Sequence, residues 1–223
     1  MAEIRHSYDW WAYQFRVVHL SGVQGIETWN DSVVKFLRFA LELRGEERLL
    51  DVACGSGPHA VRLAGQGFHV VGLDISPMLI GHCREQAARL SLSARASFCV
   101  GDMRALPFQS AFDAGYLYSG SFGFFGLPDD LRVLEGIARA LKPGGRFVID
   151  GLDPARMRAN VGPRAQARPE GVYATDTRYD DATRTMVTEF HFTDREGNLH
   201  LAAEPERVRL YEEEEMRGLC EQA

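Results

Sequence analysis

Cysteine is scarce in this sequence and is never paired in it. Cys54, Cys83, Cys99 and Cys220 are the only four among 223 residues, and no two of them form a CxxC motif. This spacing gives neither a zinc-ligand pattern nor a disulfide framework. We therefore expect buried, reduced thiols and no metal site.

Long apolar segments are also absent. The N-terminal residues contain no apolar stretch of signal-peptide length, and the apolar runs elsewhere are too short to span a bilayer. A soluble, cytoplasmic protein without membrane association is the expectation that follows. The hydrophobic content of 45% is enough for an α/β domain with its own core.

The chain has fewer basic than acidic residues, and its formal net charge is −6. Nucleic-acid affinity depends mainly on neutralising phosphates, so an acidic chain disfavours an RNA or DNA partner. The cationic stretch at residues 156–168 holds four arginines together with Pro163 and is typical of a solvated or lid-like connection. A small-molecule partner is therefore expected, and the oligomeric state is left open.

Strand-like and helix-like patterns alternate through the first two thirds of the chain. From Asn30, apolar residues recur at helical spacing, with Asn30 or Asp31 as the N-cap and Gly45 beyond the end, so residues 1–44 are predicted to form an N-terminal lid and helix. The alternation that follows predicts a Rossmann-like open parallel sheet with helices on both faces. Strands are predicted at Arg48–Val52, His69–Leu73, Ser97–Val100, Ala114–Tyr118 and Arg146–Leu152, and helices at Pro58–Ala64, Pro77–Leu90 and Asp129–Leu141.

The pattern changes after the last of these strands. Residues 153–170 indicate a loop or a short helix. Three extended stretches then predict an antiparallel meander added to the main sheet, so that loop and meander occupy 153–211. The stretches are Val172–Tyr179, Thr185–Thr193 and Leu199–Tyr211. With a C-terminal helix at 212–223, the whole chain is predicted to be a single domain around a core at 45–152.

A glycine-rich turn follows the first predicted strand. Gly55 and Gly57 would let the backbone approach a ligand beside a helix N-terminus. Taken alone, such a turn suits a dinucleotide equally well. Asp51, at the end of the strand, is unfavourable beside a pyrophosphate but suits a ligand that carries an ammonium and a sulfonium group.

Acidic residues also follow the next two strands. Asp74 lies 17 positions after Gly57, close to the separation between a glycine turn and a ribose-binding acid. Asp102 could accept a hydrogen bond from an adenine amine while Ile75 and Met103 enclose the ring. Three acids at successive strand tips predict a crevice for an adenosine-containing ligand at the carboxyl end of the sheet.

The order of these motifs resembles the class I S-adenosylmethionine-dependent methyltransferases, and most of all their small-molecule subgroup. The segments that carry the resemblance are DVACGSG, GLDIS, GDMRALPF, FDAGYLYSGSFGFF and LKPGGRFVID. It implies S-adenosyl-L-methionine as the cofactor and S-adenosyl-L-homocysteine as the product. It places the methionyl group at the turn 51–57 and at the backbone of Tyr118, the ribose at Asp74, and the adenine at Asp102. The cofactor-binding residues expected are Tyr8, Asp51, Ala53, Cys54, Gly55, Gly57, Asp74, Ile75, Met78, Gly101, Asp102, Met103 and Tyr118.

The sequence departs from the family's pattern at two places. Phe124 stands where the family often has a tyrosine, so a phenol is absent there. The sequence given ends at Ala223, where family members usually continue into two further strands. The resemblance therefore implies that a C-terminal strand hairpin is missing.

No catalytic base stands out. The methyl group of a sulfonium is already electrophilic, so catalysis would consist mainly of alignment and exclusion of water. His6 and His191 are weak candidates for a base, whereas His59 is assigned to the start of a helix. The acceptor-binding candidates are Trp11, Ser121 and Phe122.

We expect methyl transfer to a hydroxyl or amine of a small molecule. The absence of an Asn-Pro-Pro-Tyr motif argues against methylation of adenine or glutamine nitrogens. The alternatives are a non-catalytic S-adenosylmethionine-binding protein and a nucleic-acid or protein methyltransferase. A nicotinamide-dependent oxidoreductase is a further alternative, because residues 55–60 loosely fit GxGxxA.

Overall fold

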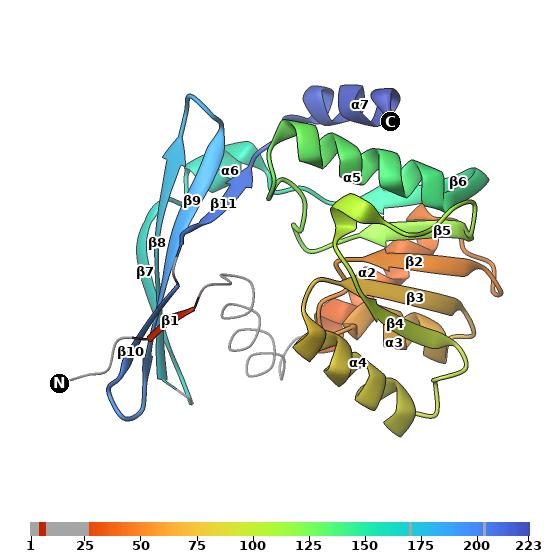
Figure 1. Cartoon of the computed structure of the whole chain (residues 1–223), viewed down its shortest axis with the longest axis horizontal. Helices are drawn as coiled ribbons and strands as arrows, with labels where there is room; N and C mark the ends of the chain where they lie inside the picture. The colour runs from red at the N-terminus through yellow and green to blue at the C-terminus, as the bar shows by residue number, and fades with distance from the viewer. Residues whose placement is uncertain (1–4, 8–26, 170, 203) are drawn as a thin grey trace.

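The computed structural model describes residues 5–7, 27–169, 171–202 and 204–223, and these form two separate β-sheets (Figure 1). The parallel sheet is surrounded by helices, and the antiparallel sheet stands beside it. Within the described residues, no helix combines the length and the apolar character needed to cross a membrane. Cys54 and Cys83 are buried and free as expected, whereas Cys220 is free but exposed.

The parallel sheet has the strand order β4-β3-β2-β5-β6, and all four of its pairings are parallel. The predicted fold class is therefore confirmed. From β2 the chain first builds outward through β3 and β4, and then returns to the other side of β2 with β5. Such a reversal creates a crevice at the carboxyl ends of the strands. The strands are β2 (Arg48–Val52), β3 (His69–Asp74), β4 (Ala96–Val100), β5 (Phe112–Leu117) and β6 (Leu141–Ile149).

Helices cover both faces of this sheet because successive strand side chains point to opposite faces. Leu49 packs in one apolar cluster with residues of α2, α3 and α4, whereas its neighbour Leu50 packs in a second cluster with residues of α5 and α7. Figure 1 shows α7 lying along α5. The helices are α2 (Glu27–Ala40), α3 (Pro58–Gly65), α4 (Pro77–Arg89), α5 (Leu127–Ala140), α6 (Pro154–Arg158) and α7 (Glu213–Gln222).

The structure confirms one predicted helix start and corrects another. α4 begins as expected, with Pro77 in its first turn and the Ser76 hydroxyl accepting a hydrogen bond from the Leu79 amide at 3.3 Å. α2 instead begins at Glu27, so the predicted N-cap at Asn30 or Asp31 is wrong. Asn30 is buried inside the helix and so does not cap it.

The predicted antiparallel meander is present, but its strands form a sheet of their own and are not added to the parallel sheet. Its order is β1-β10-β9-β8-β7, with β11 paired to β9 and only β1 running parallel to its neighbour β10. None of these strands pairs with β4 or β6, the two edges of the parallel sheet among the described residues. The strands are β1 (Arg5–Ser7), β7 (Gly162–Arg168), β8 (Gly171–Asp180), β9 (Thr185–Asp194), β10 (Leu199–Ala202) and β11 (Glu206–Arg209).

Two features of this sheet were not predicted. β7 lies in the stretch expected to be a loop or a short helix. Its side chains are polar or small and mostly exposed, so the alternation of apolar and polar residues that predicts a strand is missing. Its Pro163 is tolerated because β7 is an edge strand. The expected strand Leu199–Tyr211 is divided into β10 and β11, with Pro205 in the interruption.

The two sheets are joined where β11 meets the loop after β5. The Arg209 amide donates to the Gly123 carbonyl at 2.7 Å, and a Cβ on Gly123 would overlap the Arg209 carbonyl. The Tyr211 hydroxyl donates to Asp130 at the start of α5 at 2.6 Å. These contacts fix β11 against the carboxyl end of the parallel sheet.

Candidate functional site

A cavity of about 550 Å³ lies at the carboxyl ends of the parallel strands, at the point where the strand order reverses. Asp51 near the end of β2, Asp74 at the end of β3 and Asp102 just after β4 all line it. The structure therefore brings the three predicted acids together. The other predicted residues that line the cavity are Ala53, Cys54, Gly55, Ile75, Gly101, Met103, Tyr118 and Ser121.

Asp74 links the tip of β3 to the glycine turn. One of its carboxylate oxygens accepts from the Gly55 amide at 2.9 Å, and the other accepts from the Ser76 amide at 2.9 Å. Burial raises the pKa of the Asp74 carboxyl, against the lowering effect of these two bonds. Each carboxylate oxygen keeps a further lone pair with which to accept a ligand hydroxyl.

Asp51 lies opposite Tyr116 in the β2–β5 register, and the Tyr116 hydroxyl donates to its carboxylate at 3.0 Å. Asp51 is 3% exposed, and burial raises the pKa of its carboxyl well above the usual value. A cation placed beside it would favour the ionised form. The buried acid is therefore suited to a positively charged ligand group.

The glycine turn has an open side and a packed side. Gly55, with φ of 56°, has no atom within 4 Å of the position a Cβ would take, and it lines the cavity. Gly57, with φ of 72°, caps the start of α3, and a Cβ there would lie 2.9 Å from the Cys83 sulfur. Gly57 therefore allows packing against α4, whereas Gly55 leaves room for a ligand. Ala53 also has a left-handed φ, 55°, which is unusual for a residue with a Cβ.

Not every predicted site residue reaches this cavity. Met78 is 36% exposed in the first turn of α4, and Phe122 is buried with its ring 5.4 Å from that of Tyr211, so neither lines it. His191 lies within β9, opposite Ala174 of β8, and is also absent from the lining. His6 contributes its backbone to β1 beside β10. Tyr8 and Trp11 lie outside the described residues.

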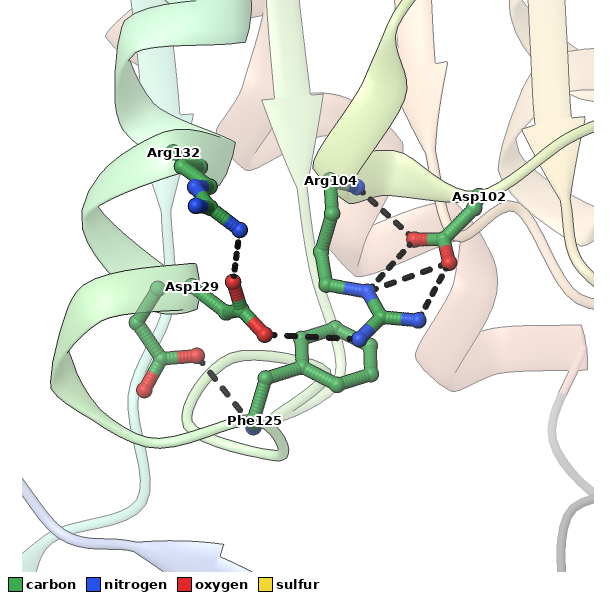
Figure 2. A network of polar contacts seen from close by, with 6 residues as sticks. Asp102, Arg104, Phe125, Asp129 and Arg132 are labelled. Carbon is green, nitrogen blue, oxygen red and sulfur yellow. Dashed lines mark hydrogen bonds and ion pairs between the residues drawn. The ribbon is translucent and has the colours of Figure 1, made fainter.

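Asp102 is engaged by a neighbour that the sequence reasoning did not consider. The Arg104 guanidinium contacts both of its carboxylate oxygens, with Nη2 2.6 Å from Oδ2 (Figure 2). This pairing lowers the pKa of the Asp102 carboxyl. Arg104 also lies over the Phe125 ring, with 4.3 Å between its central carbon and the ring centroid.

His59 also lines the cavity, although it was assigned only a structural role. It is 7% exposed, and its Nε2 atom has no hydrogen-bond partner among the described residues. Its ring meets the Tyr118 ring edge-on at 5.8 Å. Burial and the nearby Arg62 lower the pKa of His59 to about 4, so the imidazole is neutral near pH 7.

Sequence reasoning missed several residues that line the cavity. Phe124 and Phe125 lie in the motif that was singled out, but a ligand contact was not assigned to them. Glu206 comes from β11 of the second sheet, and its Oε2 atom is screened from solvent. No motif marks Glu206, because only the docking of the two sheets brings it to the cavity. The remaining lining residues are Ser56, Pro58, Leu73, Arg104, Ser119, Gly120 and Leu152.

The arrangement can hold a cationic, adenosine-like ligand. Arg104 is the only Lys or Arg among the lining residues that the structure describes, and it is paired with an acid, whereas four carboxylates line the cavity. No group of three or more His, Cys, Asp or Glu side chains in the described part of the chain is placed to hold a metal ion.

Residues 49–145 match the family described as a methyltransferase domain. The ubiquinone/menaquinone biosynthesis C-methyltransferase UbiE of Brucella anthropi is 37% identical over 124 residues, which cover 54% of this chain and 45% of that protein. The putative methyltransferase YqeM of Bacillus subtilis is 31% identical over 122 residues, covering 54% and 47%. The chain thus matches less than half the length of these relatives.

Solved structures extend the likeness across both sheets. The CcbJ methyltransferase from Streptomyces caelestis superposes with a TM-score of 0.78 at 19% identity, covering 96% of this chain and 87% of that one. CalS10 from Micromonospora echinaspora, an amino pentose methyltransferase solved with S-adenosylmethionine bound, gives 0.64 at 21% identity, covering 93% and 84%. At these identities the likeness shows a shared fold.

Proposed function

Because this chain belongs to the class I S-adenosylmethionine-dependent methyltransferases, we propose that it transfers the cofactor's methyl group to a hydroxyl or amine of a small molecule. The observation that carries the proposal is a single cavity whose lining extends beyond the expected cofactor contacts. Asp51, Asp74 and Asp102 line it, and so do Ser121 and Glu206, which are not among the residues expected to hold the cofactor. The lining therefore offers contacts to an acceptor as well as to the cofactor.

The strand-tip acids and the glycine turn fit S-adenosylmethionine on several counts. Asp74 has oxygen lone pairs for the ribose hydroxyls, Gly55 leaves open space, and the buried Asp51 favours a neighbouring ammonium group. His59 is neutral near pH 7, so it does not repel the sulfonium. The bound cofactor would supply an electrophilic methyl group, and the chain's residues would hold and align it.

Among the lining residues not assigned to the cofactor, Glu206 favours an amine as the acceptor. Its carboxylate can hold an amino group by hydrogen bonds. It can also accept the proton that nitrogen loses after forming its bond to the methyl carbon, while the sulfur keeps the electrons of the broken bond. Alignment and exclusion of water would supply most of the rate enhancement. An amino acceptor also agrees with the fold shared with CalS10, an amino pentose methyltransferase.

The competing functions differ in their acceptors. The similarity to UbiE raises carbon methylation of a small molecule as an alternative. A non-catalytic cofactor-binding protein would have the strand-tip carboxylates and no acceptor. A nucleic-acid or protein substrate is less favoured, because the net charge of −6 opposes phosphate binding and the cavity is of small-molecule size.

The proposal is tested in two steps. Calorimetric titration with S-adenosylhomocysteine should show one binding site per chain. Release of S-adenosylhomocysteine from S-adenosylmethionine should then be followed with panels of small amines, alcohols and activated carbon acids. Failure to bind would overturn the cofactor assignment, whereas binding with turnover only on carbon acids would overturn the acceptor class.

Glu206→Gln provides a sharper test of the amine. The amide keeps the shape but loses the charge and the proton acceptor, so kcat/KM for an amine acceptor should fall about tenfold, the scale of one hydrogen bond to a charged group. The dissociation constant for S-adenosylhomocysteine should stay unchanged. Glu189→Gln, on the neighbouring strand β9 and outside the cavity lining, is the control. Equal activity of Glu206→Gln and the wild type would contradict the assignment.

A further inference from the structure

Arg104 occupies the carboxylate that the adenine amine is expected to use. Its Nε atom lies 3.1 Å from Oδ1 and 3.0 Å from Oδ2 of Asp102, and its Nη2 atom lies 2.6 Å from Oδ2. Its backbone amide also donates to Oδ1 at 2.9 Å. An ionised carboxylate offers about four lone-pair positions, so these four contacts engage its accepting capacity. An adenine amine and the guanidinium are therefore competing donors for the same oxygens.

Arg104 has a second carboxylate within reach. Its Nη1 atom lies 3.4 Å from Oδ2 of Asp129, in the first turn of α5 (Figure 2). The other oxygen of Asp129 accepts from Arg132 at 2.7 Å, so Asp129 is held in place whether or not Arg104 contacts it. The Phe125 ring supports the guanidinium between the two acids. A small rotation of the guanidinium toward Asp129 would release its contacts with Asp102, where only the Arg104 backbone amide would still donate, and would leave the charge of Arg104 paired.

We propose that Arg104 controls cofactor affinity as a positioning residue that acts through Asp102. It holds this carboxylate in competition with the adenine amine and moves toward Asp129 when adenine binds. The proposal rests on the function proposed above. The Asp102 and Arg104 side chains are 30% and 39% exposed, so the shift breaks no packed core. The lowered pKa of Asp102 supports the same view, since the acid stays ionised and able to accept.

Arg104→Met tests the competition. Methionine keeps an unbranched side chain against Phe125 but removes the donors. Without the guanidinium, the adenine amine has no side-chain competitor for Asp102, so S-adenosylhomocysteine should bind Arg104→Met more tightly than the wild type. Because ion pairs between partly exposed charges are weak, calorimetric titration should show a gain in affinity of only about two- to fivefold. Arg104→Lys, which lacks the planar fork, should fall between the two. Arg132→Met, which loses a contact with Asp129 but none with Asp102, should bind like the wild type.

A second ligand separates competition from a general change in the fold. S-inosylhomocysteine carries a carbonyl in place of the adenine amine, so this position cannot donate to Asp102, and Arg104 can instead donate to it. The preference for the adenine ligand should therefore increase in Arg104→Met. Weaker or equal binding by Arg104→Met, or an unchanged preference, would overturn the role of Arg104. A wild-type protein that binds neither ligand would instead overturn the proposed function. This failure would be seen with the wild type alone, before any variant is made.

Discussion

Asp74→Ala should weaken binding of S-adenosylhomocysteine by about 3 kcal/mol, or roughly 100-fold. The carboxylate bonds the Gly55 and Ser76 amides and is proposed to accept the ribose hydroxyls as well. A buried donor left without an acceptor costs about 1–3 kcal/mol. The alanine variant loses the ribose contacts and also loosens the turn against which the cofactor would lie, so its effect should be at the upper end of this range.

Two comparisons separate the ribose contact from the support of the turn. Asp74→Asn keeps one carbonyl oxygen, so it should retain part of the affinity. The wild type should bind the 2′-deoxyribose analogue of S-adenosylhomocysteine more weakly than the parent, and Asp74→Ala should no longer distinguish them. Asp113→Ala, which removes an acid at the opposite end of the sheet beside Lys142, is the charge control. Calorimetry that finds full affinity in Asp74→Ala would disprove the ribose assignment.

The positions of the three strand-tip acids could be predicted because they depend on local pattern. Asp51, Asp74 and Asp102 each follow a short apolar run, and the carboxyl ends of parallel strands meet at one edge of a sheet. The hydrogen-bond partners of these acids could not be predicted in the same way. Asp51 meets Tyr116 only because β5 returns to the side of β2 with that register, 65 positions along the chain. Periodicity along the sequence carries no information about such a register.

Residues from the second sheet could not be placed from the sequence. Glu206 reaches the cavity through the docking of β11 against the loop at Gly123, a contact that depends on backbone shape. Arg104 was overlooked for a different reason, since it lies two positions after Asp102 in a motif already read as an adenine site. A cationic side chain beside a strand-tip acid can use the same carboxylate oxygens as a ligand. Such a neighbour therefore has to be identified before the acid is assigned to a ligand.

The charge state of His59 links the site to stability. Its ring lies in the cavity wall and meets the rings of Tyr116 and Tyr118 edge-on, and no described partner satisfies its Nε2 atom. A protonated imidazole there would be desolvated, close to Arg62, and would repel the cofactor's sulfonium. The fold therefore holds His59 neutral, with its pKa lowered to about 4.

This lowered pKa makes stability depend on pH in one direction. In the unfolded chain a histidine has a pKa of about 6.5, so between that pH and about 4 the unfolded state binds a proton that the folded state does not. The free energy of unfolding should therefore decrease as the pH falls through this window. For His59 alone the loss should be about 2 kcal/mol at pH 5 and about 3 kcal/mol at pH 4.

His59→Leu isolates this contribution, because leucine cannot bind the proton in either state. Buried acids such as Asp51 and Asp74 have raised pKa values and act in the opposite direction, since protonation favours their folded forms. They remain in both proteins, so their effect cancels in the difference between wild type and variant. Urea unfolding from pH 7 to pH 4.5 should show the wild type losing stability relative to His59→Leu, while His69→Leu, at an exposed position, should follow the wild type. Parallel curves for the wild type and His59→Leu would mean that the imidazole accepts its proton in the folded protein as easily as in the unfolded chain.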